Sequence, residues 1–399
     1  ASSQKAIDAL VNCIPEKAHG FNTQEIANTL NSLSKWPECV KEDFYQKAMD
    51  ALVNCIPEKS HGFNTQDISN TLNALSKWPQ WMQQASYQKA MDALVDCIPE
   101  RAHDFNPQGI ASTLNALSKW SSDRLTERVF YVKARDVLVS RISQKAHIFK
   151  AREISNTLNA LSKWPERTRG VFYLNAIDAL IDCIPEKSHD FNAQEIANTL
   201  NALSKWPRSM KRVFYSKAID MLVEGIPERA DDFNAQNISN TLNALSKWPN
   251  RIKEMSYLKA INALVDCIPE RANTFDLQNI ANILNAFTKW SECMKKSVYS
   301  KAIDILVEGI PERADDFNAQ IIVSLALTGC LFQLADSSNF LLIKMREIIK
   351  NNEKIILKEL DPIIAKQFCQ IHRYQPDLMT DELETVIKSD RFKLKFKSE

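Results

Sequence analysis

A tryptophan returns at a fixed interval along most of the chain. The interval is 42 residues, with a single one of 44, and the positions are Trp36, Trp78, Trp120, Trp164, Trp206, Trp248 and Trp290. A phenylalanine keeps the same period and marks eight repeats, at Phe21, Phe63, Phe105, Phe149, Phe191, Phe233, Phe275 and Phe317. A fixed period of this length is typical of helical solenoids, in which each repeat buries its apolar face only against its neighbours.

The second repeat shows why two helices are expected in each one. Apolar residues within 45–56 recur at a spacing of three to four, which predicts an amphipathic helix with one buried face that ends before Pro57. Phe63 and Asn64 then have the residue types of a hydrophobic staple and an N-cap, so a second helix is predicted to begin here and to run to Trp78. We call the two helices of a repeat helix A and helix B.

The pattern predicts an all-α protein. We expect an α-solenoid of the right-handed superhelix type, with eight helix pairs of about 42 residues over 1–332 and a helical C-terminal cap over 333–399. The repeats are expected near 1–37, 38–79, 80–121, 122–165, 166–207, 208–249, 250–291 and 292–332. Only 7 glycines are present, which leaves little room for sheet turns or flexible linkers.

The two ends of the predicted array differ from its middle. Helix B of the eighth repeat is apolar nearly all round, so we expect helices near 340–349, 355–371 and 381–387 to cover it. At the other end, Ile7, Leu10 and Val11 would form an uncovered apolar edge. We expect further chain upstream, and we expect this edge to promote self-association.

Cysteine and histidine recur at single repeat positions. Cys13, Cys55, Cys97, Cys183 and Cys267 share one position, which other repeats fill with glycine or arginine. The histidine two residues before the phenylalanine is replaced by Asp or Asn in the later repeats. We therefore interpret both as tolerant structural positions, expect reduced thiols of a cytoplasmic protein, and predict no metal and no cofactor.

One face of helix B carries the same polar residues in seven repeats. A glutamine or arginine, two asparagines and a lysine, spaced four, three and four, form one straight line opposite the apolar face. We call this line the stripe, and its predicted binding residues are Gln24, Asn28, Asn31, Lys35, Gln66, Asn70, Asn73, Lys77, Gln108, Asn115, Lys119, Arg152, Asn156, Asn159, Lys163, Gln194, Asn198, Asn201, Lys205, Gln236, Asn240, Asn243, Lys247, Gln278, Asn282, Asn285 and Lys289. Ser112 takes the place of the first asparagine in the third repeat.

Three explanations of the stripe are open. Recent duplication would preserve it without a function. An asparagine in each repeat could also hold the backbone of the neighbouring repeat, as an amide ladder. Alternatively, an extended polymer lies along the array, and the lysines provide charge for its phosphates. In that case the variable third residue of helix B, called N3, is a candidate for specificity, at Glu25, Asp67, Gly109, Glu153, Glu195, Asn237 and Asn279.

Two helix B segments resemble a known family. Residues 105–120 and 191–206 are similar to the octotricopeptide repeat, whose pattern runs F-x-P-Q-x-L-A-N-x-L-W-A-L-A-K-L. The resemblance implies a paired-helix solenoid that binds RNA, of a kind often found upstream of a RAP domain. Residues 365–374 and 381–387 look like the passage before such a domain. Related arrays occur in intracellular bacteria, which implies a bacterial protein of this kind or one delivered into a host cell.

Two classes of function follow from these patterns. Paired carboxylates with acid–base spacing, a Ser-His-Asp arrangement and a glycine-rich phosphate loop are missing from the sequence, so an enzyme is not expected. Because 50 basic residues nearly balance 49 acidic ones, a nucleic-acid site has to be a local basic stripe. We predict single-stranded RNA binding along a concave face formed by helices B. The alternative is an interaction scaffold that holds an extended peptide, as armadillo arrays do. No membrane partner is expected.

Overall fold

A computed structural model of the chain describes residues 2–35, 43–78, 80–81, 83–120, 129–164, 171–206, 213–290, 297–310, 317–334 and 340–388. Within these ranges every regular element is a helix, as the sequence predicts. The chain forms two compact units, residues 1–191 with 205–221, and residues 192–204 with 222–399.

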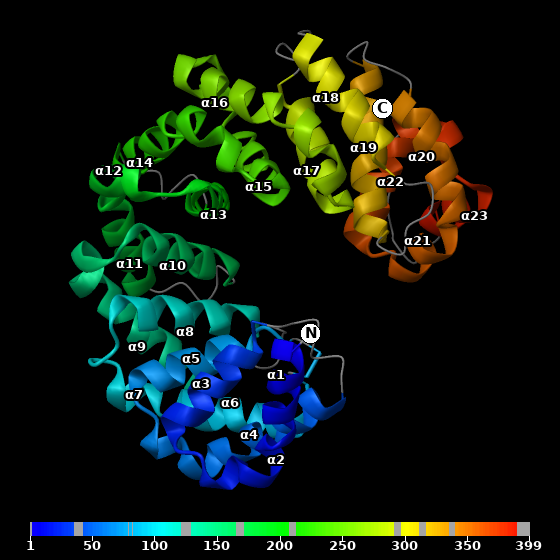
Figure 1. The fold of residues 1–399 in the computed structure, drawn as a ribbon. Helices are drawn as coiled ribbons and strands as arrows, with labels where there is room; N and C mark the ends of the chain where they lie inside the picture. Colours follow the sequence, from blue (N-terminus) through cyan, green and yellow to red (C-terminus); the bar gives the residue numbers. More distant parts are fainter. Residues whose placement is uncertain are drawn as a thin grey trace. The chain divides into compact units, whose positions relative to one another are not determined.

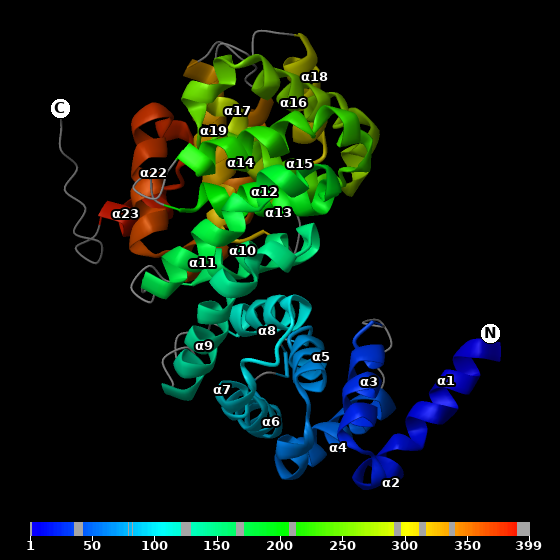
Figure 2. The same ribbon diagram turned by 90° about the vertical axis from the view of Figure 1, so that its left-hand side faces the viewer.

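The first compact unit consists of two layers of helices that pack in sequence order (Figures 1 and 2). One layer contains helices B, α3 (Thr23–Leu33), α5 (Thr65–Leu75), α8 (Pro107–Lys119) and α10 (Ala151–Lys163). The other contains helices A, α1 (Ser2–Asn12), α4 (Asp43–Lys59), α6 (Ala85–Asp96), α9 (Val129–Lys145) and α11 (Val171–Asp182). Short helices extend some helices A, at α2 (Ile14–Lys17), α7 (Ile98–Arg101) and α12 (Ile184–Lys187).

The second compact unit has the same order. Its helices B are α13 (Ala193–Ser204), α15 (Ala235–Leu245), α17 (Leu277–Thr288) and α19 (Ala319–Leu334), and each packs on the next. Its helices A are α16 (Met255–Asp266) and α18 (Ser297–Glu308), while α14 (Val213–Glu224) contains the boundary between the two compact units. Packing of each helix on its neighbours in sequence is the arrangement of an α-solenoid.

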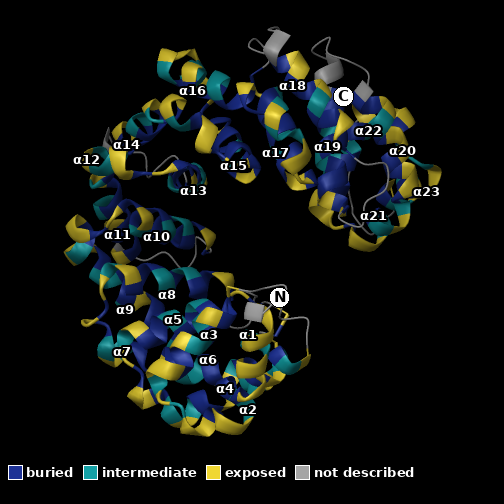
Figure 3. Cartoon of the chain, in the orientation of Figure 1, coloured by how far each residue is buried: buried dark blue, intermediate teal, exposed yellow. Residues whose placement is uncertain are grey.

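The repeated aromatic residues fill the space between repeats, as expected. The phenylalanines that precede helix B are buried from Phe63 onwards, and the described tryptophans are all buried. Trp120 packs edge-on against Tyr131 of the next helix A, with ring centroids 6.4 Å apart. Trp164 meets Tyr173 at the same distance. Trp36 lies outside the described residues. Figure 3 shows that buried residues gather where helices meet.

The predicted start of helix B is confirmed. The Asn64 side chain accepts a hydrogen bond from the Asp67 backbone N–H at 2.9 Å, and equivalent caps occur at Asn22, Asn106, Asn234 and Asp276. The predicted end of helix A needs a correction. Helix α4 continues through Pro57 to Lys59, because a proline in the last turn sacrifices only one hydrogen bond of the helix.

In five repeats a basic residue near the end of helix A ties the repeat to the previous one. Lys145 Nζ donates to the backbone carbonyls of His103, at 3.0 Å, and Phe105, at 2.7 Å. Lys59 and Lys187 make the same pair of contacts, whereas Arg101 and Arg271 donate only to the carbonyl at the histidine position. The histidine position thus contributes a backbone carbonyl to the contact, which explains why its side chain varies.

The cap helices form at the C-terminal end. Helices α20 (Phe340–Asn351), α21 (Glu353–Glu359) and α22 (Pro362–Tyr374) contact α19, as expected for an apolar helix that must be covered, and α23 (Asp381–Lys388) contacts α21 and α22. The helix predicted over 355–371 is two helices, since Asp361 caps α22 with hydrogen bonds of 2.8 Å from two backbone N–H groups.

The apolar edge of the first repeat is narrower than predicted. Leu10 is 72% exposed, whereas Val11 is 4% exposed and belongs to the core. An open groove of about 370 Å³ lies beside Ile7, Leu10 and Leu33. No described helix is long and apolar enough to cross a membrane.

Candidate nucleic-acid interface

The structure places the stripe on the accessible side of helix B. In all seven repeats the glutamine or arginine and the lysine are exposed. The asparagines are half-buried, except Asn28, which is exposed, and Ser112 is half-buried as well. The stripe therefore presents amide groups to solvent with an ammonium group at one end of each helix.

The stripe amides are not used to hold the fold together. Among the described residues, the side chains of the stripe glutamines and asparagines make one hydrogen bond, from Gln278 Nε2 to Asn282 Oδ1 at 3.1 Å, within α17. None bonds to a neighbouring repeat. The amide-ladder explanation is thus wrong, because the basic residues at the end of helix A make that connection instead.

Within each compact unit the stripe lysines form a row in which a lysine lies near that of the next repeat, from Lys35 to Lys205 in the first unit and from Lys247 to Lys289 in the second. Lys77 Nζ donates to Ser34 Oγ of the preceding helix B at 3.1 Å, and Lys289 makes the same contact to Ser246 at 3.4 Å. Both serines are C-cap residues, and a cation is favourable at this end of a helix. The helix end beside them thus stabilises Lys77 and Lys289, and the stripe lysines remain exposed to solvent.

Burial and, second, neighbouring positive charges lower the pKa values of several stripe lysines. Desolvation, followed by the charge of Lys35, lowers the pKa of Lys77, and desolvation with the charge of Lys77 lowers that of Lys119. In the second compact unit, desolvation and the nearby Lys247 lower the pKa of Lys289 to about 8. Neighbouring ammonium groups that repel each other are stabilised by an anion placed between them.

The N3 residues have local roles at the start of helix B. The carboxylate of Glu25 accepts a hydrogen bond from the Asn22 backbone N–H at 2.8 Å, which closes a capping box, and Glu153 and Glu195 make the same bond. Asp67, Gly109, Asn237 and Asn279 are buried. These contacts give N3 a part in helix capping and packing, and the selection of a ligand by N3 stays a prediction.

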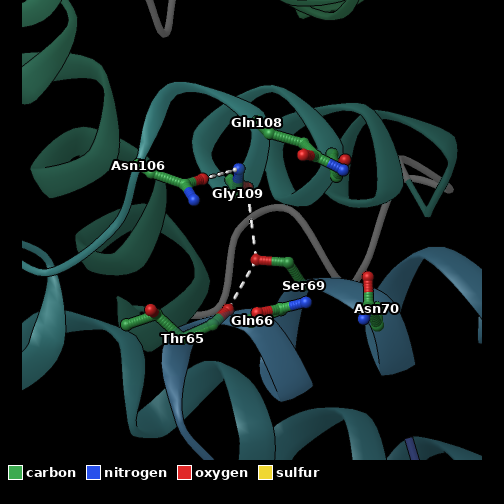
Figure 4. A pocket seen from close by; sticks show the side chains of 8 residues that line it. Thr65, Gln66, Ser69, Asn70, Asn106, Gln108 and Gly109 are labelled. Atoms are coloured by element: carbon green, nitrogen blue, oxygen red, sulfur yellow. Dashed lines mark hydrogen bonds between the residues drawn. The ribbon is translucent and has the colours of Figure 1, made fainter. Parts of the chain in front are cut away.

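One polar pocket of about 100 Å³ interrupts the regular surface between α5 and α8 (Figure 4). It is lined by Thr65, Gln66, Ser69, Asn70, Asn106, Gln108, Gly109 and Ser112. Sequence reasoning missed it. The available signal was the third repeat, where N3 is a glycine and the first stripe asparagine is a serine, so two side chains of one surface are shortened together.

The remaining repeated polar residues are structural. Cys55 Sγ lies 3.7 Å from His19 Nδ1 of the previous repeat, and desolvation raises the pKa of the Cys55 thiol, which keeps it protonated. The helix A aspartates accept hydrogen bonds from the next repeat, as Asp8 does from Tyr45 at 3.2 Å. In the described part of the chain no cluster of three or more His, Cys, Asp or Glu side chains could hold a metal ion.

Comparison with known proteins supports the repeat architecture. Seven segments match the family DUF1601, described as a protein of unknown function. The chain is a helical repeat protein. The matches cover residues 3–30, 50–72, 88–114, 134–158, 188–200, 222–242 and 258–284. Most run from helix A into helix B. Helix α19 and the cap lie outside them. Among curated proteins, no sequence matches the chain.

Proposed function

We propose that the chain is a binding protein without catalytic activity that holds single-stranded RNA along the stripe. One observation carries the proposal: the stripe amides of the described repeats are without partners in other repeats, while the lysines are gathered into a row. A surface that is repeated but not used for folding calls for a repeated ligand.

The charge of the row favours a polyanion over a peptide. Desolvation and, second, the charge of a neighbouring lysine lower the pKa values of Lys119 and Lys289, so a phosphate backbone that passes along the row would favour their charged forms. A basic peptide would need free carboxylates beside the stripe. The glutamates at N3 are instead bound to backbone N–H groups of their own helices, and Asp67 is buried.

Two further parts of the proposal concern origin and location. We propose that the repeats are relatives of the octotricopeptide repeat, on the strength of the helix B pattern. We also propose a reducing compartment such as the cytoplasm, because every described cysteine is a free thiol.

The test compares two triple variants of equal net charge. The first replaces Lys77, Lys119 and Lys163 of the stripe with alanine. The control replaces Lys47, Lys89 and Lys133, which recur with the same period and are exposed on helix A. Fluorescence anisotropy with labelled RNA, single-stranded DNA and a peptide pool measures binding at several salt concentrations.

The stripe variant should bind RNA roughly 100-fold more weakly at about 0.1 M salt. Each single-strand phosphate contact contributes about 0.7 to the slope of log K against log salt, so the slope should fall by about 2. The control should bind nearly as tightly as the parent. Equal weakening by both variants, or tight binding of the peptide pool and none of RNA, would refute the proposal.

A further inference from the structure

The pocket between α5 and α8 lies where the third repeat has two short residues on one surface. At N3 the other six repeats that carry the stripe have Glu, Asp or Asn, and the third repeat has Gly109. At the first asparagine of the stripe it carries Ser112. Residues three apart are neighbours on a helix, so both losses open the same place beside α5.

The floor of the pocket is rigid. Ser69 Oγ lies 2.7 Å from the Thr65 carbonyl oxygen and 3.3 Å from the Gly109 carbonyl oxygen, and it accepts a hydrogen bond of 3.1 Å from Thr113 (Figure 4). The Asn106 side chain accepts from the Gly109 backbone N–H at 2.7 Å. The contacts of Ser69 with Gly109 and Thr113 join the two helices at the floor of the pocket.

The walls of the pocket, in contrast, have free hydrogen-bonding groups. Among the described residues, the side chains of Gln66, Asn70, Gln108 and Ser112 have no hydrogen-bond partner. They come from both helices and surround the opening. A ligand that enters would find amide donors and acceptors on two sides.

The lining also defines the chemistry of the occupant. It contains neither a charged nor an aromatic side chain, so it matches neither a phosphate nor a stacked ring. An amide carries a donor and an acceptor side by side, which matches the donor and acceptor pairs on the edge of a nucleobase. Sequence-specific RNA recognition uses such contacts to bases that have left the stack.

We propose that this pocket takes one nucleobase, edge first, and that repeats two and three are where the otherwise uniform array reads sequence. The inference rests on the proposed RNA binding. In the other described repeats the stripe has nearly the same residues, so it would make the same contacts with any RNA sequence. The pocket differs from them, and a base seated there would set the register of the RNA.

The test fills the pocket with residues that the array already uses. Ser112→Asn restores the stripe residue of the other repeats, and a double variant adds Gly109→Asn, as in the sixth and seventh repeats. A Cβ atom at Gly109 would lie 3.1 Å from Ser69 Oγ, so the single variant remains informative if the double one folds poorly. The control is Ser216→Asn, the same change at an exposed position of helix A.

Each protein is mixed with a random 20-nucleotide RNA pool, and the bound RNA is sequenced. Its affinity for a uridine homopolymer is measured in parallel. The parent and the control should enrich one base at one position by about fivefold or more. The filled variants should lose that enrichment while homopolymer affinity changes less than about twofold.

The outcomes separate the two proposals. Retention of the same base preference by Ser112→Asn, or RNA binding by the parent without any preferred base, would overturn the pocket and leave RNA binding intact. No binding of either RNA by the parent would overturn both.

Discussion

Raising the pH should weaken RNA binding through Lys289 well before ordinary lysines lose their charge. Desolvation, then the positive charge of Lys247 and a contact with its side chain, lower the pKa of Lys289 from 10.5 to about 8. A phosphate beside Lys289 favours its protonated form, so binding should be linked to proton uptake.

The size of the effect follows from that pKa. If Lys289 is fully protonated in the complex, the dissociation constant rises by about tenfold between about pH 7 and pH 9. A lysine with an unshifted pKa would change it by only a few per cent over the same range. Lys289 is exposed, so salt and solvent screen part of its attraction to the phosphate. We therefore expect the affinity for RNA to fall by about 3- to 10-fold over this pH range at about 0.1 M salt.

The assay is anisotropy with an RNA that contains only adenine, since this base does not titrate in that range, at constant ionic strength. Lys289→Arg is the matched variant, because arginine keeps its charge across the range. It should bind as the parent does at neutral pH and lose the pH dependence. The reasoning fails if the parent and Lys289→Arg have the same pH profile.

Folding should respond to pH in the opposite direction. The folded Lys289 binds fewer protons than the unfolded one between its lowered pKa and its ordinary pKa. The free energy of unfolding should therefore rise with pH in this window. Weaker RNA binding together with unchanged or higher stability would show that the loss is not caused by unfolding.

Three other predictions concern the scaffold. Lys145→Met leaves two backbone carbonyls of the previous repeat without their donor and should lower the free energy of unfolding by about 2 kcal/mol. The control Lys133→Met should change it by less than about 0.5 kcal/mol, and both are measured by urea titrations followed by circular dichroism. Deleting residues 336–399 uncovers α19 and should cause aggregation by light scattering; a soluble monomer would contradict this. Leu10→Glu should reduce concentration-dependent self-association in sedimentation, and an unchanged profile of association would count against the apolar edge.

The helical architecture was predictable because its determinants are local. The apolar spacing within 45–56 and the cap at Asn64 depend on residues only a few positions apart. The tryptophans recur with the period of the repeat. Even the cap helices around α19 followed from one helix that is too apolar to remain exposed. The errors were local too: α4 continues past Pro57, and Asp361 divides a helix that was predicted as one.

The use of the polar groups could not be predicted in the same way. The sequence shows where Glu25, Asn31 and Lys77 lie on helix B, but not whether their atoms already have partners. The structure shows that Glu25 closes a capping box, that Asn31 bonds to no other repeat and that Lys77 lies near Lys35. The capping box of Glu25 is local, whereas the partners of Asn31 and Lys77 depend on how closely neighbouring repeats, about 40 residues apart in sequence, approach each other.

The sequence alone therefore determined the helix pairs, their order and the accessible stripe, because helix periodicity and capping depend on neighbouring residues. Only the tertiary structure decided which stripe groups are free, how strongly the lysines repel each other and where the shortened side chains of Gly109 and Ser112 open a pocket. Hydrogen bonding, desolvation and packing are set by how closely one repeat approaches the next, and that approach is a property of the folded chain.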